Sequence, residues 1–307
     1  MSSHGDRILK ETECLSPCRR AKKREKAQIV SELRQRHPLK ELLKLSGIAR
    51  STYYYHIKQK DNDKYAAEKT DIAEIFNKNK GIYGYRRITE QLKKKGYSIN
   101  HKTVLKLIKS LNLRGKQSKN GKYHSYKGEV GKIADNILKR DFTAKKPFEK
   151  LATDVTEFKV CNDKVYLSPV LDLFNREIVS YSISLSPNLQ QVRDMLTGLF
   201  IKLPPGASPI FHSDQGWQYQ HAEYQRLLAE HNITQSMSRK GNCMDNGAME
   251  NFFGRLKVEM FYGEQFESVD DFILALDNYI HYYNNERISL KLKGMSPVQY
   301  RTHALAS

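Results

Sequence analysis

Three acidic residues in the carboxyl-terminal half of the chain have contexts that suit metal-dependent phosphoryl transfer. Asp154 lies in LATDVTEF, Asp214 in IFHSDQGWQY and Glu250 in NGAMENFFGRLK. We expect the first within a strand, the second at the end of a strand and the third in an early turn of a helix. Three carboxylates at one point repel each other unless divalent cations neutralise them, and a pair of such cations can activate a nucleophile and stabilise a leaving oxygen.

A basic residue accompanies the last of these acids. In the helix predicted around Glu250, the acid lies roughly 60° from Phe253, at the edge of the apolar stripe, from where it can reach a cleft. Lys257 lies seven residues further on, about 20° from the same line, and therefore two turns away on the same face. A cation at this position can hold a DNA phosphate beside bound metal ions.

Spacing alone leaves a second interpretation open. The chain contains 34 acidic residues, so carboxylates at such separations also occur by chance. These acids would then cap helices or pair with Lys and Arg. The rival candidates for a metal-binding role are Asp163, Asp172, Asp245 and Glu259, of which Asp172, on a predicted strand, is the strongest.

Positive charge is concentrated in one half of the chain. Residues 1–150 contain 38 Lys and Arg against 16 Asp and Glu, whereas residues 151–307 contain 14 against 18. This asymmetry favours a polyanion-binding arm joined to a domain with another task, and nucleic acid is the polyanion we expect. A merely solvated basic surface is the alternative.

Other classes of protein fit the sequence poorly. No apolar run is long enough for a membrane span, and the first residues lack the apolar core of a secretory signal. The four cysteines form no zinc-binding pattern, so we expect free thiols. We therefore expect an intracellular protein without a membrane partner.

The basic half reads as two helical DNA-binding units. Residues 22–60 follow a helix-turn-helix pattern with Gly47 in the turn, and residues 61–113 repeat it, with Asn100 as a helix N-cap. An ordinary helical hairpin is the alternative for the first unit. The candidate DNA contacts are Arg50, Ser51, Thr52 and Tyr54 in the first unit and Arg86, Arg87, His101, Lys102 and Lys106 in the second.

The remaining segments complete the domain prediction. Residues 1–21 form an N-terminal extension, and residues 114–145 read as a basic linker. From residue 146 to 302, three strands followed by alternating helices and strands indicate an α/β core of ribonuclease-H-like fold, with a mixed five-stranded sheet. In this core Arg239 and Lys240 precede the helix of Glu250, and we predict that they contact substrate DNA.

Several long motifs resemble one protein family. TDVTEF, FHSDQGWQY, QSMSRKGNCMDNGAMENFFGRLK and YIHYYNNERISLKLKGMSPVQY are similar to the OrfB transposase of the IS-three insertion-sequence family, and GIYGYRRI extends the likeness into the helical region. Asp154, Asp214 and Glu250 fall on that family's DDE triad, and Lys257 falls on the basic residue that follows it. The resemblance implies an enzyme that cleaves and joins DNA strands, related to retroviral integrases.

The resemblance also implies cofactors and partners. We expect two Mg²⁺ or Mn²⁺ ions per active site, held by the three acids. The expected partners are the terminal inverted repeats, target DNA, further copies of the chain on DNA and an OrfA protein from an upstream reading frame. The expected location is the bacterial cytoplasm, in association with the nucleoid.

Two rival functions remain at this point. A nuclease of the same fold would hydrolyse DNA without joining strands, and a sequence-specific DNA-binding protein would need no catalysis. Transfer of pre-cleaved DNA ends would identify a transposase over a nuclease. An Asp214→Asn variant with unchanged function would favour the binding protein.

The basic arm leads to a first prediction. Binding of duplex DNA should weaken steeply as salt is raised, because Lys and Arg release condensed counterions when they neutralise phosphates. Titrations of fluorescent duplex DNA at several salt concentrations measure this dependence. A flat salt response would contradict the polyanion-binding arm.

Overall fold

The computed structural model describes residues 23–60, 63–116, 132–239 and 243–306. Contacts within the chain divide it into two compact units, residues 1–71 and residues 72–307. Among the described residues, no helix is both long and apolar enough to cross a membrane.

The first unit contains three short helices, α2 (Lys23–Leu33), α3 (Leu39–Ser46) and α4 (Arg50–Lys60). The turn between α3 and α4 begins at Gly47, whose φ of 65° is a left-handed conformation that glycine adopts without strain. A small apolar cluster holds the helices together and contains Ala27, Val30, Leu42, Ile48 and Tyr53. The helix, turn and helix expected from the sequence are present.

A second helical group follows and consists of α5 (Ala66–Lys78), α6 (Tyr85–Lys94) and α7 (His101–Ser110). Ile88 and Leu92 are fully buried on α6, and Val104 is fully buried on α7. The Asn100 side chain accepts a hydrogen bond from the Lys102 amide at 2.8 Å, so the predicted N-cap is confirmed.

The α/β region after the helical groups contains one mixed sheet. Its strands are β1 (Lys150–Thr153), β2 (Thr156–Val160), β3 (Asp163–Asp172), β4 (Ile178–Ser184), β5 (Ile210–Ser213) and β6 (Thr234–Met237). β3 pairs antiparallel with β1, β2 and β4, whereas β1, β5 and β6 are parallel neighbours. The predicted mixed sheet is confirmed.

The sheet has six strands where five were predicted, because the first predicted run is divided at Asp154 and Val155. The pairings Thr153↔Val170 and Thr156↔Leu167 share one register, which places Pro169 opposite Asp154. Proline has no amide hydrogen, so β3 lacks one ladder hydrogen bond at this place. Asp154 therefore lies in a break between strands and not inside a continuous strand.

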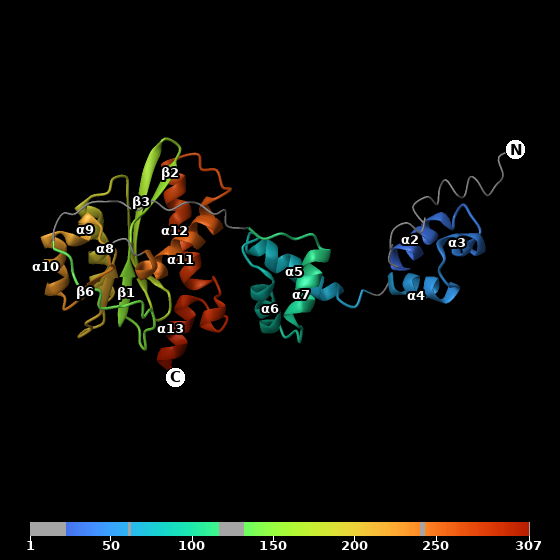
Figure 1. Ribbon diagram of the computed structural model, residues 1–307, viewed down its shortest axis with the longest axis horizontal. Coiled ribbons are helices and arrows are strands. Elements are labelled where there is room, and N and C mark those ends of the chain that lie inside the picture. The colour runs from blue at the N-terminus through green and yellow to red at the C-terminus, as the bar shows by residue number, and fades with distance from the viewer. Residues whose placement is uncertain (1–22, 61–62, 117–131, 240–242, 307) are drawn as a thin grey trace. The chain divides into compact units, whose positions relative to one another are not determined.

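Helices cover both faces of the sheet (Figure 1). One face packs on α8 (Leu189–Lys202), α9 (Trp217–Gln220) and α10 (Ala222–Glu230) through a cluster that includes Leu151 and Phe211. The other face packs on α11 (Gly247–Leu256) and α12 (Val269–Asn285) through a cluster that includes Ala152 and Phe158. Leu151 and Ala152 are adjacent and enter opposite clusters, as strand alternation requires. The chain continues into α13 (Pro297–Ala306).

Part of the predicted linker belongs to this core. Leu138 is 2% exposed and packs in the same cluster as Phe158. The backbone amides of Ile137 and Leu138 donate to the Ser236 hydroxyl at 3.0 and 3.2 Å. The described residues of the predicted linker after position 131 are therefore anchored on the sheet, because an apolar side chain and two amides find buried partners there. Residues 117–131 lie outside the described ranges.

This anchoring predicts a difference between two adjacent residues. Leu138→Ala should lower the free energy of unfolding by about 2–5 kcal/mol, because it leaves a cavity in the core. Ile137→Ala is the matched control, since Ile137 is 43% exposed, and it should change stability by less than about 0.5 kcal/mol. Denaturant unfolding measures both values, and equal effects would show that the segment is not part of the core.

Candidate active site

Parallel pairing of β1 with β5 brings two of the predicted acids together. Ala152 pairs with His212 in the ladder, so Asp154 and Asp214 each lie two residues beyond the same rung. Neighbouring strands are about 4.8 Å apart. The two aspartates therefore lie side by side at the carboxyl ends of adjacent parallel strands.

The environment of these aspartates opposes their ionisation. Burial and the charge of Asp214 raise the pKa of Asp154 well above its ordinary value. Burial likewise raises the pKa of Asp214. One backbone amide partly offsets this for each acid, because Val155 donates to Asp154 at 2.7 Å and Gly216 donates to Asp214 at 2.9 Å. Two buried like charges with so few donors form a site that would be stabilised by a bound cation.

Two residues that the sequence analysis did not single out as functional surround this pair. Tyr219 on α9 is fully buried, and burial together with the charges of Asp154 and Asp214 raises the pKa of its hydroxyl. A Cβ atom at Gly216 would lie 3.0 Å from the Asp214 carboxylate and 2.6 Å from the end of the Gln218 side chain. The spacing Asp-Gln-Gly after an apolar strand was the available signal that a glycine lies against the carboxylate.

Helix α11 brings the third acid within electrostatic range of Asp154. The Asn246 side chain, directly before α11, donates to the Thr153 carbonyl at 3.4 Å, which ties the start of the helix to the end of β1. Glu250 lies in the first turn of α11, is exposed and contributes to the raised pKa of Asp154. Its carboxylate is therefore within electrostatic range of the buried pair.

Lys257 lies at the end of the same helix. Its ammonium is 5.4 Å from the centre of the Phe158 ring, and its charge lowers the pKa of Asp154. Burial lowers the pKa of Lys257, while the charges of Asp154 and Glu157 act in the opposite direction. The Lys257 ammonium is therefore close enough to Asp154 to favour its ionised form. Among the described residues, however, no three His, Cys, Asp or Glu side chains are already grouped closely enough to hold a metal ion.

Two of the rival acids, Asp172 and Asp245, have structural partners instead. The Asp172 carboxylate accepts hydrogen bonds from the Phe148 and Phe174 amides, and burial raises its pKa to about 6. Asp245 pairs with Arg239 at 2.9 Å and with Arg140 at 2.7 Å, and these partners hold its pKa far below its ordinary value. Asp163, a further rival, is exposed at the start of β3.

Glu259 forms a buried ion pair. It accepts hydrogen bonds from Arg287 and from the Tyr279 hydroxyl, and Arg87 lies 3.6 Å away. Burial opposes its ionisation, but the hydrogen bonds and charge of Arg287 hold the pKa of Glu259 below its ordinary value. Arg87, predicted to contact DNA, thus has a protein partner in this structure.

The other predicted DNA contacts differ in their surroundings. Arg239 is 60% exposed although it pairs with Asp245, and Lys240 lies outside the described residues. His212, two residues before Asp214, was not among the predicted contacts; it is buried with its ring nitrogens near the Ser236 and Ser238 hydroxyls and does not face solvent. Exposed positions are occupied by Arg50, Ser51 and Tyr54 on α4, by Arg86 on α6, and by His101, Lys102 and Lys106 on α7.

Fold and site together describe an enzyme with paired carboxylates at the end of a ribonuclease-H-like sheet. Comparison with known families agrees. Models described as Integrase core domain match residues 144–243 and residues 250–305, and a model described as HTH-like domain matches residues 61–121.

Similar proteins are transposases. The chain is 52% identical over 275 residues to the transposase InsK for insertion sequence element IS150 of Escherichia coli, which covers 89% of this chain and 97% of InsK. It is 56% identical over 207 residues to a transposase-like protein of Haemophilus influenzae, covering 67% and 95% of the two chains. It is 35% identical over 236 residues to the transposase InsF for insertion sequence IS3A of Escherichia coli, covering 76% and 82%.

Comparison with solved structures finds matches that include two retroviral proteins. A chain of the simian T-cell lymphotropic virus intasome is 16% identical, with a TM-score of 0.43 and coverage of 75% of this chain and 74% of that one. The HTLV-2 integrase catalytic core is 17% identical, with a TM-score of 0.38 and coverage of 51% and 97%.

The chain belongs to the family of insertion-sequence transposases with an integrase core domain that includes those of IS150 and IS3. It is a DNA transposase of the DDE class, a polynucleotidyl transferase. The alternatives of a nuclease without joining activity and of a binding protein without catalysis are therefore set aside.

Gly216 provides a test of the aspartate geometry. Gly216→Ala should lower the rate of DNA cleavage roughly tenfold or more while the fold is retained, because the added methyl group displaces the Asp214 carboxylate. Gly84→Ala is the control, since a Cβ atom there meets nothing within 4 Å. Cleavage assays and thermal unfolding of both variants measure the effect, and unchanged cleavage by Gly216→Ala would contradict this role of the glycine.

Proposed function

We propose that Asp154, Asp214 and Glu250 are the catalytic carboxylates of this transposase and that they hold two Mg²⁺ or Mn²⁺ ions. The observation that carries this proposal is the adjacency of Asp154 and Asp214 at the ends of β1 and β5. Both acids have raised pKa values, and backbone amides are their hydrogen-bond donors. Glu250, in the first turn of α11, would complete the site, and its charge contributes to the raised pKa of Asp154.

The residues present fit a divalent metal. All three donors are carboxylate oxygens, which hard cations such as Mg²⁺ prefer. The repulsion that raises the pKa of Asp154 would be relieved by a cation, so binding and ionisation would favour each other. When bound, such ions polarise the phosphodiester and lower the pKa of an attacking water or hydroxyl group.

Residues of the chain would orient the aspartates and hold the DNA strand. Gly216 and Val155 orient the aspartates through their amides. Lys257, at the far end of α11, would hold a phosphate of the same DNA strand beside the acids. In-line attack at phosphorus requires positioning and charge stabilisation but no covalent enzyme intermediate. Hydrolysis frees a 3′-hydroxyl group, and the same site then directs that hydroxyl group at target DNA.

The helical units would recognise the terminal inverted repeats. Arg50, Ser51 and Tyr54 share the exposed face of α4, where the Arg50 guanidinium lies 5.8 Å from the centre of the Tyr54 ring. On α7 the exposed residues His101, Lys102 and Lys106 form a second basic surface. We further propose that Arg86, Arg239 and Lys240 contact DNA, that several copies of the chain assemble on DNA at the nucleoid, and that an OrfA protein takes part.

A set of matched variants tests the triad. Asp154→Asn, Asp214→Asn and Glu250→Gln should each lower cleavage and strand joining roughly a hundredfold or more, because each removes a charge that holds a metal ion. DNA binding should persist, because the helical units carry the proposed recognition surfaces. The assay uses duplexes with the element's end sequence, both uncut and pre-cleaved, with Mg²⁺ or Mn²⁺.

Asp163→Asn is the control variant, since Asp163 is an exposed acid at the start of β3. It should cleave and join like the unmodified protein. Full activity of any triad variant would remove that residue from the proposed site.

A further inference from the structure

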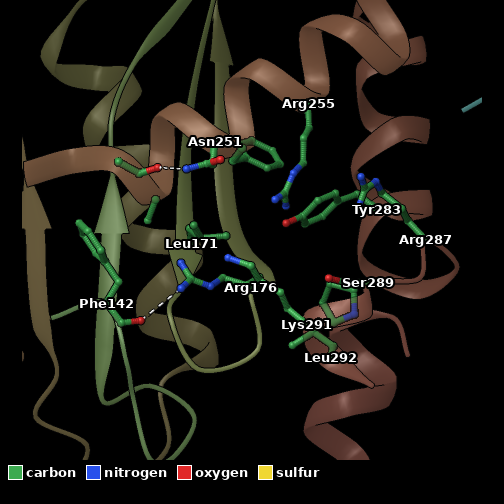
Figure 2. Close-up of a pocket in the computed structure, with 14 residues that line it drawn as sticks. Phe142, Leu171, Arg176, Asn251, Arg255, Tyr283, Arg287, Ser289, Lys291 and Leu292 are labelled. Carbon is green, nitrogen blue, oxygen red and sulfur yellow. Dashed lines mark hydrogen bonds between the residues drawn. The ribbon is translucent and has the colours of Figure 1, made fainter. Parts of the chain in front are cut away.

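A cavity of about 210 Å³ lies beside α11, and Asp154, Asp214 and Glu250 are not among the residues that line it (Figure 2). Its lining comes from elements far apart in sequence, including Phe142, the turn between β3 and β4, α11, α12 and the segment after α12. Phe142, Leu171 and Tyr283 provide apolar walls, while Arg176, Arg255 and Lys291 provide charge. The cavity therefore combines defined walls with several cations.

The charge of this cavity is not balanced by its own lining. Acidic side chains are missing from the residues that line it. Arg287, which also lines it, is neutralised by Glu259. Within the described part of the chain, Arg176, Arg255 and Lys291 have no ion pair with a carboxylate, and the Arg176 guanidinium donates a hydrogen bond to the Phe142 carbonyl, at 3.2 Å.

The cations also repel one another. Burial lowers the pKa of Arg176, and the nearby charge of Arg255 lowers it further. Burial raises the pKa of the Tyr283 hydroxyl, whereas the charges of Arg255 and Arg176 lower it. The carboxylate of Asp172 offsets part of this charge but is held by two backbone amides. An anion in the cavity would relieve this repulsion, and guanidinium groups match phosphate oxygens in geometry.

The cavity shares lining residues with an open hollow at Glu250. An open hollow along α11 is lined by Glu250, Asn251, Gly254, Arg255, Val258 and Glu259. Asn251 and Arg255 line both the hollow and the cavity. Arg255 follows Glu250 by five positions, a rise of about 7.5 Å along the helix. Along the axis of a DNA duplex, where each strand carries one phosphate about every 3.4 Å, this rise corresponds to about two nucleotides.

We propose that this cavity is a phosphate-binding subsite for a DNA backbone phosphate about two nucleotides from the phosphodiester at Glu250. The assignment of that phosphodiester rests on the proposed function. Arg255 and Lys291 bind the phosphate oxygens. Arg176, in the turn between β3 and β4, adds positive charge. The subsite fixes the register of the strand relative to the carboxylates.

The first experiment measures DNA binding by an Arg255→Gln/Lys291→Gln variant. The matched control, Arg226→Gln/Lys202→Gln, removes one Arg and one Lys from exposed positions outside the cavity. An arbitrary duplex is titrated at several salt concentrations without metal, so neither cleavage nor end recognition is needed. The cavity variant should bind roughly tenfold to a hundredfold more weakly and show a salt slope smaller by about one. Binding equal to that of the control would overturn the proposal.

The second experiment locates the phosphate. End duplexes carry a single neutral methylphosphonate at successive positions near the cleavage point. The unmodified protein should lose affinity when the position about two nucleotides away is neutralised, and the cavity variant should not respond to that substitution. An equal response in both proteins would contradict the subsite.

Inorganic phosphate serves as the competing ligand. Suppose inorganic phosphate binds in the cavity, but neutralising single DNA phosphates affects the unmodified protein and the cavity variant equally. The cavity then binds free phosphate, and the DNA assignment is wrong. Glu250→Gln separates this proposal from the catalytic one. If that variant still cleaves DNA, the triad fails, whereas the binding readouts continue to test the cavity.

Discussion

The parallel pairing of β1 with β5 is the constraint on which the rest of this enzyme depends. It places Asp154 and Asp214 at adjacent strand ends, and their mutual repulsion is increased by burial. A fold would not keep two such carboxylates together for its stability, since buried like charges are costly. The sheet can sustain them because its two apolar faces are covered by separate helical clusters. The unfavourable pair is the feature through which the sheet would attract cations and, with them, DNA.

Helix α11 connects this pair to several other features. Glu250 lies in its first turn, Arg255 and Lys257 follow toward its end, and Glu259 comes after it. These residues point to different surroundings: the aspartates, the basic cavity and the buried Arg287 ion pair. One helix would thereby keep the proposed catalytic acid and the proposed phosphate-binding cations at fixed spacing along a DNA strand.

Much of the architecture could be predicted because it depends on local pattern. Helical periodicity identified α6 and α7, and Asn100 caps α7 as expected. The mixed sheet followed from β-rich runs with turns between them. The break at Asp154 was not predictable, because it depends on Pro169 lying opposite in another strand. Residues after position 131 looked like a polar linker, yet Leu138 and two amides find partners contributed by distant strands.

The sequence by itself determined the residue types, the charge asymmetry and the long motifs that connect this chain to DNA transposition. Spacing alone could not separate Asp154 and Asp214 from Asp172 and Asp245, because a carboxylate has the same chemistry wherever it stands in the chain. The tertiary structure shows how their partners differ: Asp245 contacts two arginines and Asp172 two backbone amides, whereas the charge of Asp214 acts on Asp154. Folding also gathered Arg176, Arg255 and Lys291 around one cavity. Long-range pairing, which no local pattern encodes, sets the electrostatic environment of each group.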